Sequence, residues 1–210
     1  MAEPTMRSPL HSFGLEAQAK TIDSSSGVWA NEVPYLGYIS LRGNAADPAF
    51  VTAASTAIGA PLPLRPCTLA ASNGVKVLWL APDEWMIVCA RQQLAGLVGR
   101  LGQALADIHS QVADNSGGYT QVIVQGRNAL DVLQHASVYD FAPLDAGRVV
   151  GTTFGKSSVY VHLQGDGYCL MLRRSFADYI WRYLVRAAAP YGMGIARFDT
   201  GEPAGRGVAA

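Results

Sequence analysis

The chain has 210 residues, of which 50% are hydrophobic and 15% are charged, and its 16 basic and 16 acidic residues give a formal net charge of zero. This length and hydrophobicity exclude disorder and allow a core that needs no disulfide or metal staple. The balanced charge excludes a basic surface for nucleic acid or an anionic membrane, and the low charged fraction favours association with other proteins.

Residues 1–33 show no sustained hydrophobic period and contain the serine run Ser24–Ser26, so we expect an extended N-terminal arm. A regular domain follows over 34–198, and 199–210 form a C-terminal tail. The N-terminus lacks the basic and apolar segments of a secretory signal, and no stretch approaches the ~20 apolar residues of a membrane-spanning helix. We therefore expect a cytoplasmic protein.

The first part of the domain predicts a strand, a helix, a hairpin and a second helix. Tyr38–Arg42 alternates as a strand, and Asp47–Pro48 opens a short helix, where proline suits a first-turn position. Pro82 and Asp83 favour a tight turn between two hairpin strands. The remaining elements expected here are strands near 67–71, 75–80 and 85–90 and an amphipathic helix over 92–105.

The same order of elements recurs in the second part of the domain. We expect a strand over 119–125, a helix over 128–135, hairpin strands over 158–163 and 168–172, and a closing helix whose apolar stripe is Phe176, Ile180, Tyr183, Leu184 and Ala187. An offset of 83 positions places Gly43 on Gly126, Arg91 on Arg174 and Leu101 on Leu184. We therefore predict an internal duplication, with repeats at about 36–106 and 119–189. The fold class that follows is α+β, with duplicated β-α-β-β-α units, mainly antiparallel sheets and helices packed on one face.

Cysteine and histidine residues give no sign of a metal site. Cys67, Cys89 and Cys169 are far apart, and no CxxC pair occurs, so we expect reduced core thiols and neither a disulfide framework nor a thiolate zinc site. The histidines are scattered without a helical pair. His162 alternates with apolar neighbours, and we expect its side chain to point outward from a strand.

Two glycine-containing stretches resemble nucleotide-binding loops only in part. Gly155–Ser157 lacks the required earlier glycine and precedes a strand instead of a helix, so we interpret it as a solvated turn. Gly192–Gly194 lacks the third glycine of a dinucleotide-binding turn and is expected to be a loop after the last helix. The chain also has no G-x-S-x-G nucleophile motif.

Three charged residues are candidates for a binding role. Asp114 precedes the turn Ser116–Gly118, and we expect it to cap that turn; the alternative is a carboxylate that faces a ligand, although it lacks a partner base. Arg91 and Arg174 end equivalent hairpins. We expect each to pair a nearby carboxylate or to cap a sheet end, and the alternative is binding of an anionic ligand or of a partner's acidic group.

Two helices carry residues that their apolar stripes do not explain. Tyr179 and Trp181 lie away from the stripe of the closing helix, which makes them candidates for a protein interface or for a second core layer. Asp178 and Arg182 on the same helix are spaced for an ion pair. On the earlier helix, Gly96, Gly99 and Gly102 share one face and would allow another element to approach closely.

Four stretches form a pattern that is distinctive in combination. They are Leu78–Trp85 with its Pro-Asp-Glu-Trp turn, followed by Met86–Val88, then Asp114–Thr120, Val122–Ala129 and Arg174–Ala177. Together they resemble the gamma subunit of heterotetrameric sarcosine oxidase, from about Leu36 to Ala189. The resemblance implies a domain like the folate-binding part of the glycine-cleavage T-protein.

The same resemblance implies an accessory, non-catalytic subunit that assembles with alpha, beta and delta subunits. Such a complex oxidises sarcosine to glycine and yields hydrogen peroxide with formaldehyde or 5,10-methylenetetrahydrofolate. FAD, FMN, NAD, tetrahydrofolate and zinc are expected in the other subunits, and no catalytic, cofactor-binding or metal-binding residue is expected in this chain. The glycine-rich Ser116–Gly118 departs from related folate proteins, which often have bulkier or charged residues there. The alternative is a stand-alone folate-binding one-carbon-transfer protein.

Overall fold

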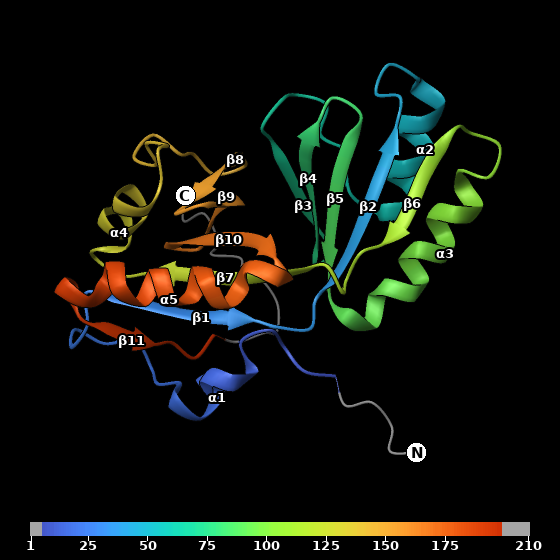
Figure 1. Ribbon diagram of the computed structural model, residues 1–210. Helices are drawn as coiled ribbons and strands as arrows, with labels where there is room; N and C mark the ends of the chain where they lie inside the picture. The colour runs from blue at the N-terminus through green and yellow to red at the C-terminus, as the bar shows by residue number, and fades with distance from the viewer. Residues whose placement is uncertain (1–5, 199–210) are drawn as a thin grey trace, which may run out of the picture.

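The computed structural model describes residues 6–198, so the expected tail at 199–210 lies outside the described residues. Two mainly antiparallel sheets dominate it (Figure 1). The first contains β2 (Gly37–Gly43), β3 (Leu69–Ser72), β4 (Val75–Ala81), β5 (Glu84–Cys89) and β6 (Ser110–Asp114). The second contains β1 (Val28–Val33), β7 (Tyr119–Gln125), β8 (Val149–Phe154), β9 (Ser157–Gln164), β10 (Gly167–Arg173) and β11 (Met193–Ile195).

The helices lie on the outer face of each sheet. The α-helices are α1 (Leu15–Gln18), α2 (Pro48–Ile58), α3 (Leu94–Ala104), α4 (Ala129–Ala136) and α5 (Ala177–Ala188). Short 3-10 helices are η1 (His11–Phe13), η2 (Arg91–Gln93), η3 (Arg174–Phe176) and η4 (Ala189–Tyr191). Figure 1 shows α2 and α3 beside the first sheet and α4 and α5 beside the second. The expected α+β class is confirmed. None of the helices within 6–198 has the length and apolar character needed to cross a bilayer.

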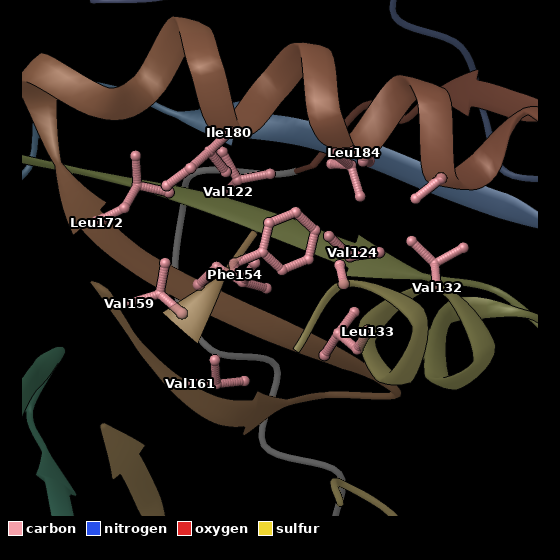
Figure 2. Close-up of a cluster of buried hydrophobic side chains, with 14 of the residues drawn as sticks. Val122, Val124, Val132, Leu133, Phe154, Val159, Val161, Leu172, Ile180 and Leu184 are labelled. Atoms are coloured by element: carbon pink, nitrogen blue, oxygen red, sulfur yellow. The ribbon is translucent and has the colours of Figure 1, made fainter. Parts of the chain in front are cut away.

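Each sheet forms its own hydrophobic core with its two helices. In the first core, Ile39 and Trp85 of the sheet pack against Phe50 of α2 and Leu97 of α3. Figure 2 shows the second core, where Val122 and Val124 of β7 lie beneath Ile180 and Leu184 of α5, with Phe154 between the sheet and the helices. Burial of each such side chain contributes about 1.5–3 kcal/mol before entropy, so the helices are needed for sheet stability.

Helix α2 begins at Asp47–Pro48, as the sequence predicts. The Asp47 carboxylate accepts a hydrogen bond from the Ala49 N–H (2.9 Å), Pro48 occupies the first turn, and Gly59 ends the helix with φ of 76°. The start of α2 also requires Gly43 on β2, because a Cβ there would lie 2.3 Å from the Phe50 ring.

The two sheets pack against each other through their inner faces. A third cluster of buried residues joins them: Tyr38, Leu78, Met86, Val88, Tyr119, Val149 and Met171. Backbone hydrogen bonds connect the two halves at one edge, from the Leu69 N–H to the Gly147 carbonyl (2.8 Å) and from the Val149 N–H to the Cys67 carbonyl (3.0 Å). The two halves therefore form a continuous structure.

The elements recur in nearly the same order at an offset of 83 residues. Strands β2, β4 and β5 and helices η2 and α3 correspond to β7, β9, β10, η3 and α5, with bounds that differ by at most one residue. Helix α2 and strand β3 match α4 and β8 less closely. This agreement supports the predicted duplication, although a common origin of the two halves stays a prediction.

The expectation of an extended arm over 1–33 is wrong for the described residues 6–33, because η1 and α1 lie within them and Leu10 and Leu15 belong to the second core. Val28–Val33 forms β1, which lies between β7 and β11 and pairs with both. In the first sheet β6 pairs directly with β2, whereas β1 separates the corresponding strands β7 and β11 in the second sheet. Its partners lie about 90 residues or more away in sequence, so local periodicity could not indicate the strand.

Gly192–Gly194 also differs from the expected loop, because Met193–Ile195 forms the edge strand β11. The strand pairs in parallel with β1, through Val28 opposite Met193 and Trp29 opposite Gly194. The Trp29 ring covers Gly194 so closely that a Cβ there would lie 2.4 Å from it. The glycine therefore serves packing against Trp29.

Candidate interaction site

The described part of the chain, 6–198, contains no group of three or more His, Cys, Asp or Glu side chains that could hold a metal ion. Gly155 and Lys156 form the turn between β8 and β9, as expected from the sequence, whereas Ser157 already belongs to β9 and is buried. The Lys156 N–H donates to the Tyr179 hydroxyl oxygen (3.0 Å), so this backbone donor is already used within the protein.

Asp114 caps the turn that follows β6, as predicted. One carboxylate oxygen accepts hydrogen bonds from the N–H (2.9 Å) and the hydroxyl (2.5 Å) of Ser116. The Ser116 hydroxyl oxygen accepts from the Tyr38 N–H (3.0 Å). Burial raises the pKa of the Asp114 carboxyl, but the hydrogen bonds from Ser116 and the charge of Arg91 together lower this pKa below its ordinary value. The carboxylate therefore organises the loop.

A cavity of about 320 Å³ lies where the N-terminal segment meets the ends of both sheets. We call it the arginine pocket, since Arg7, Arg91 and Arg174 all line it. The other lining residues are Met6, Ser8, Pro9, Tyr35, Leu36, Ser116, Gly117, Tyr119 and Thr120. The structure thus brings together Arg91 and Arg174, which the sequence placed at equivalent positions of the two repeats.

Of the two structural roles expected for Arg91 and Arg174, pairing with a nearby carboxylate is wrong within 6–198, whereas their position directly after the last strand of each hairpin is as expected. The salt bridges within 6–198 are Arg42–Asp83 (2.6 Å) and Arg182–Asp178 (2.9 Å), and neither involves the pocket. A guanidinium nitrogen of Arg174 donates instead to the Arg7 carbonyl oxygen (2.6 Å). The physical reason is the position of the Asp114 carboxylate, which bonds Ser116 and lies beyond salt-bridge distance of Arg91.

His162 is 1% exposed, so the expectation of an outward side chain is wrong. Alternation along β9 predicts correctly that His162 and Gln164 share a face of the strand. The first sheet covers that face. Lys76 of β4 shows this contact, because its ammonium donates to the Gln164 side-chain oxygen on β9 (2.7 Å).

Burial and, secondarily, the Lys76 charge lower the pKa of His162 to about 4. Its Nδ1 lies 2.8 Å from the Leu163 carbonyl oxygen and therefore carries the proton of the neutral ring. Within 6–198, Nε2 is buried without a hydrogen-bond partner. Burial also lowers the pKa of Lys76. The layer between the sheets thus disfavours additional positive charge.

The three cysteines are free thiols. Burial raises the pKa of Cys89 and of Cys169 to about 11, so both are protonated at neutral pH and are poor nucleophiles. The expectation of core thiols is confirmed for these two residues. Cys67 is only partly buried and lies in the link before β3, so it does not belong to the core.

Helix α5 presents a mixed surface. Trp181 is 2% exposed and belongs to the core, with its ring centroid 6.2 Å from that of Phe13, whereas Tyr179 remains exposed. Phe176 is 47% exposed, which corrects the expected apolar stripe: it lies in η3, before the helical period of α5 begins. The expected Asp178–Arg182 ion pair is confirmed.

The glycine face of α3 does not receive another element of the described chain. A Cβ at Gly99 or Gly102 would have no atom within 4 Å, and one at Gly96 would meet only the flexible Arg100 side chain. The prediction of a close approach is therefore wrong for the contacts within 6–198.

Sequence reasoning missed Arg7 and Tyr35 as members of the pocket. Tyr35 has φ of 62°, a left-handed conformation that glycine or asparagine would have indicated in the sequence and tyrosine did not. Arg7 lies in the segment expected as an arm, and its position depends on contacts with the distant Arg174. The only sequence signal for this position was the presence of the basic residue Arg7 in the N-terminal segment.

Comparison with known proteins gives consistent results. The model of the sarcosine oxidase, gamma subunit family matches residues 42–190. A curated sarcosine oxidase subunit gamma from an Arthrobacter species is 27% identical over 183 residues, which cover 83% of this chain and 87% of that protein.

Solved structures support the fold. A chain of heterotetrameric sarcosine oxidase from Corynebacterium sp. U-96, in complex with pyrrole 2-carboxylate, has a TM-score of 0.80 and 24% identity, and the match covers 92% of this chain and 99% of that chain. Glycine cleavage system aminomethyltransferase T from Bartonella henselae has a TM-score of 0.62 and 15% identity, over 84% of this chain and 56% of that one. At these identities the likeness shows the fold alone, which this chain shares with both proteins. Since the family model spans most of the chain, the protein belongs to the sarcosine oxidase gamma subunit family.

Proposed function

We propose that this chain is an accessory, non-catalytic gamma subunit of a heterotetrameric sarcosine oxidase. The observation that carries the proposal is the likeness to a curated gamma subunit over 87% of that protein's length. In this proposal the chain works in the cytoplasm with alpha, beta and delta subunits, which hold FAD, FMN, NAD, tetrahydrofolate and zinc. Together they convert sarcosine to glycine with hydrogen peroxide and formaldehyde or 5,10-methylenetetrahydrofolate.

The surface supports an accessory role, because it exposes large apolar side chains that a partner would cover. They are Met6, Ile22, Tyr35, Leu64, Val138, Phe176, Tyr179, Val185 and Tyr191. Val138, two residues after the end of α4, is 92% exposed. The low charged fraction of the chain acts in the same direction, since few charges oppose association.

The chemistry of the described side chains supports a non-catalytic role. The Asp114 carboxylate is held by Ser116, and the Cys89 and Cys169 thiols are protonated and buried. A carboxylate used for loop structure and two inert thiols offer no acid–base or nucleophilic pair for a reaction.

The test is co-expression of this chain with the alpha, beta and delta subunits, followed by purification through a tag on this chain. We expect an equimolar yellow complex that produces hydrogen peroxide from sarcosine, whereas the purified chain alone is colourless and inactive. A complex of the other three subunits that is fully stable and active, and that does not bind this chain, would contradict the proposal.

The fold likeness to aminomethyltransferase T favours one test of a second function, folate binding by the chain alone. Tetrahydrofolate titration of the purified chain measures it. Tight binding that Asp114→Ala abolishes would replace the accessory role with a folate-binding role.

A further inference from the structure

We propose that the arginine pocket receives an acidic segment of a partner subunit, whose carboxylates bind Arg91 and Arg174. The inference rests on the proposed function and adds to it the docking surface and the chemistry of the partner. Its basis is the charge, the position and the rim of the pocket.

Within the described chain, the arginines of the pocket form no salt bridge, and the nearest compensation is the Asp114 carboxylate, which interacts with Arg91 only through its charge. Three of its lining residues are arginines and none is acidic. The salt bridges of residues 6–198 lie elsewhere, on Arg42 and Arg182. A guanidinium buried by a partner without acceptors and a counter-charge would be strongly unfavourable, and carboxylates supply both at once. The planar fork of arginine also matches a carboxylate with two parallel hydrogen bonds.

The position of the two central arginines is fixed by the fold. Arg91 begins η2 and Arg174 begins η3, each directly after the last strand of a hairpin. Arg174 is further held by the hydrogen bond to the Arg7 carbonyl oxygen (2.6 Å), which uses one of its five N–H donors. Two cations from separate halves of the chain therefore line one cavity, where a single acidic segment can contact both.

The rim of the pocket has the composition of a protein interface. Met6 is 56% exposed and Tyr35 is 45% exposed, and arginine, tyrosine and methionine are all enriched where proteins meet. Tyr35 also holds a left-handed φ of 62°, a conformation that non-glycine residues rarely adopt and that concentrates at functional sites.

The exposure of this rim favours a protein segment over a free small anion. A small-molecule site buries most of its ligand in an enclosed space, and about 320 Å³ is near the lower limit for such sites. A polypeptide that inserts acidic side chains would at the same time cover Met6 and Tyr35. The low charged fraction of the chain means that such a cluster of like charges is a local feature and not a property of the whole surface.

The experiment measures the affinity of this chain for the co-purified alpha, beta and delta subunits. The double variant Arg91→Gln with Arg174→Gln is expected to weaken binding by roughly thirtyfold or more, because a charge-paired interface contact is lost. The affinity of the original chain should fall with added sodium chloride, and that of the double variant should fall less steeply. Arg91→Lys keeps the positive charge but loses the planar guanidinium. This single variant is expected to bind more tightly than the double variant and more weakly than the original chain.

Arg127→Gln is the matched control, because Arg127 is an exposed arginine beyond the opposite end of β7 from the pocket. This variant should bind like the original chain. Thermal unfolding of each variant verifies that the fold is intact. If the original chain joins the complex and the double variant binds equally well, this inference is wrong while the proposed function stands. If the original chain does not join the complex, the proposed function itself fails.

Calorimetric titration of the isolated chain with succinate and with inorganic phosphate separates a free-anion site from a docking site. We expect no more than weak binding of either anion. Tight binding that the double variant removes, together with unchanged assembly, would overturn the proposal.

Discussion

Acidification should destabilise the protein through His162, whose ring is buried between the sheets. Burial and the Lys76 charge lower the pKa of this histidine from its ordinary 6.5 to about 4. The unfolded chain therefore takes up a proton near pH 6.5, where the folded chain still keeps the ring neutral. Uptake of a proton by the unfolded state alone favours unfolding, so stability is lost progressively as the pH falls from 6.5 to about 4.

The size of the effect follows from the difference between the two pKa values. It corresponds to a loss of up to about 3 kcal/mol of unfolding free energy over this range. Protonation would add a second charge beside the Lys76 ammonium, at a nitrogen that has no hydrogen-bond partner within residues 6–198. Above about pH 7.5 the ring is neutral in both states, and it contributes almost no pH dependence there.

The assay is urea unfolding of the original chain and of His162→Gln across this pH range, with m-values compared to establish that both unfold alike. Glutamine is polar but does not titrate, so the variant should lose less stability on acidification than the original chain, by up to about 3 kcal/mol. The carboxylates common to both chains cancel in the comparison. Parallel pH profiles for the two chains would refute the reasoning.

Two further predictions concern packing and capping. Gly194→Ala should destabilise the fold by about 1–3 kcal/mol, because the new methyl group would lie 2.4 Å from the Trp29 ring. Gly99→Ala, on the open face of α3, should instead stabilise it by about 0.5–1 kcal/mol, and equal effects of these two substitutions on thermal unfolding would contradict the account of the glycines. Asp47→Ala should cost about 1 kcal/mol, since the hydrogen bond to the Ala49 N–H at the start of α2 is lost; Asp47→Asn keeps an acceptor there and should restore most of the stability in denaturant titrations.

The helices and hairpins were predictable because their signals are local. Leu97 and Leu101 repeat at helical spacing on α3, and both are buried as that spacing indicates. Pro82 and Asp83 carry the turn between β4 and β5, and Gly59 ends α2 in the left-handed conformation that favours glycine. Such features depend on residues within a few positions of one another.

The missed features depend on contacts between distant segments. The strand β1 exists because β7 and β11 pair with its two edges. His162 is buried because Lys76 and the first sheet cover its face of β9, and alternation alone does not say which face is covered. The arginine pocket likewise needs Arg7 and Arg174 to meet across most of the chain length.

Composition and residue spacing predicted the general class of the protein, and the motif pattern predicted its family. Composition and spacing indicated a protein without obvious catalytic groups and with a surface suited to association. The pattern around Pro82–Trp85, Asp114–Ser116 and Arg174–Phe176 indicated the gamma subunit family, which the family match confirms. Residue pattern alone placed Arg91 and Arg174 at equivalent positions, but only the fold brought them to one cavity.

Native mass spectrometry of the assembly captured through this chain tests most directly whether it is an accessory subunit. The account predicts a complex of one copy of this chain with one copy each of the alpha, beta and delta subunits. All of the bound flavin should stay with those three subunits when the complex dissociates. A mass that contains only copies of this chain, or a flavin that stays with it after the companions dissociate, would contradict the account.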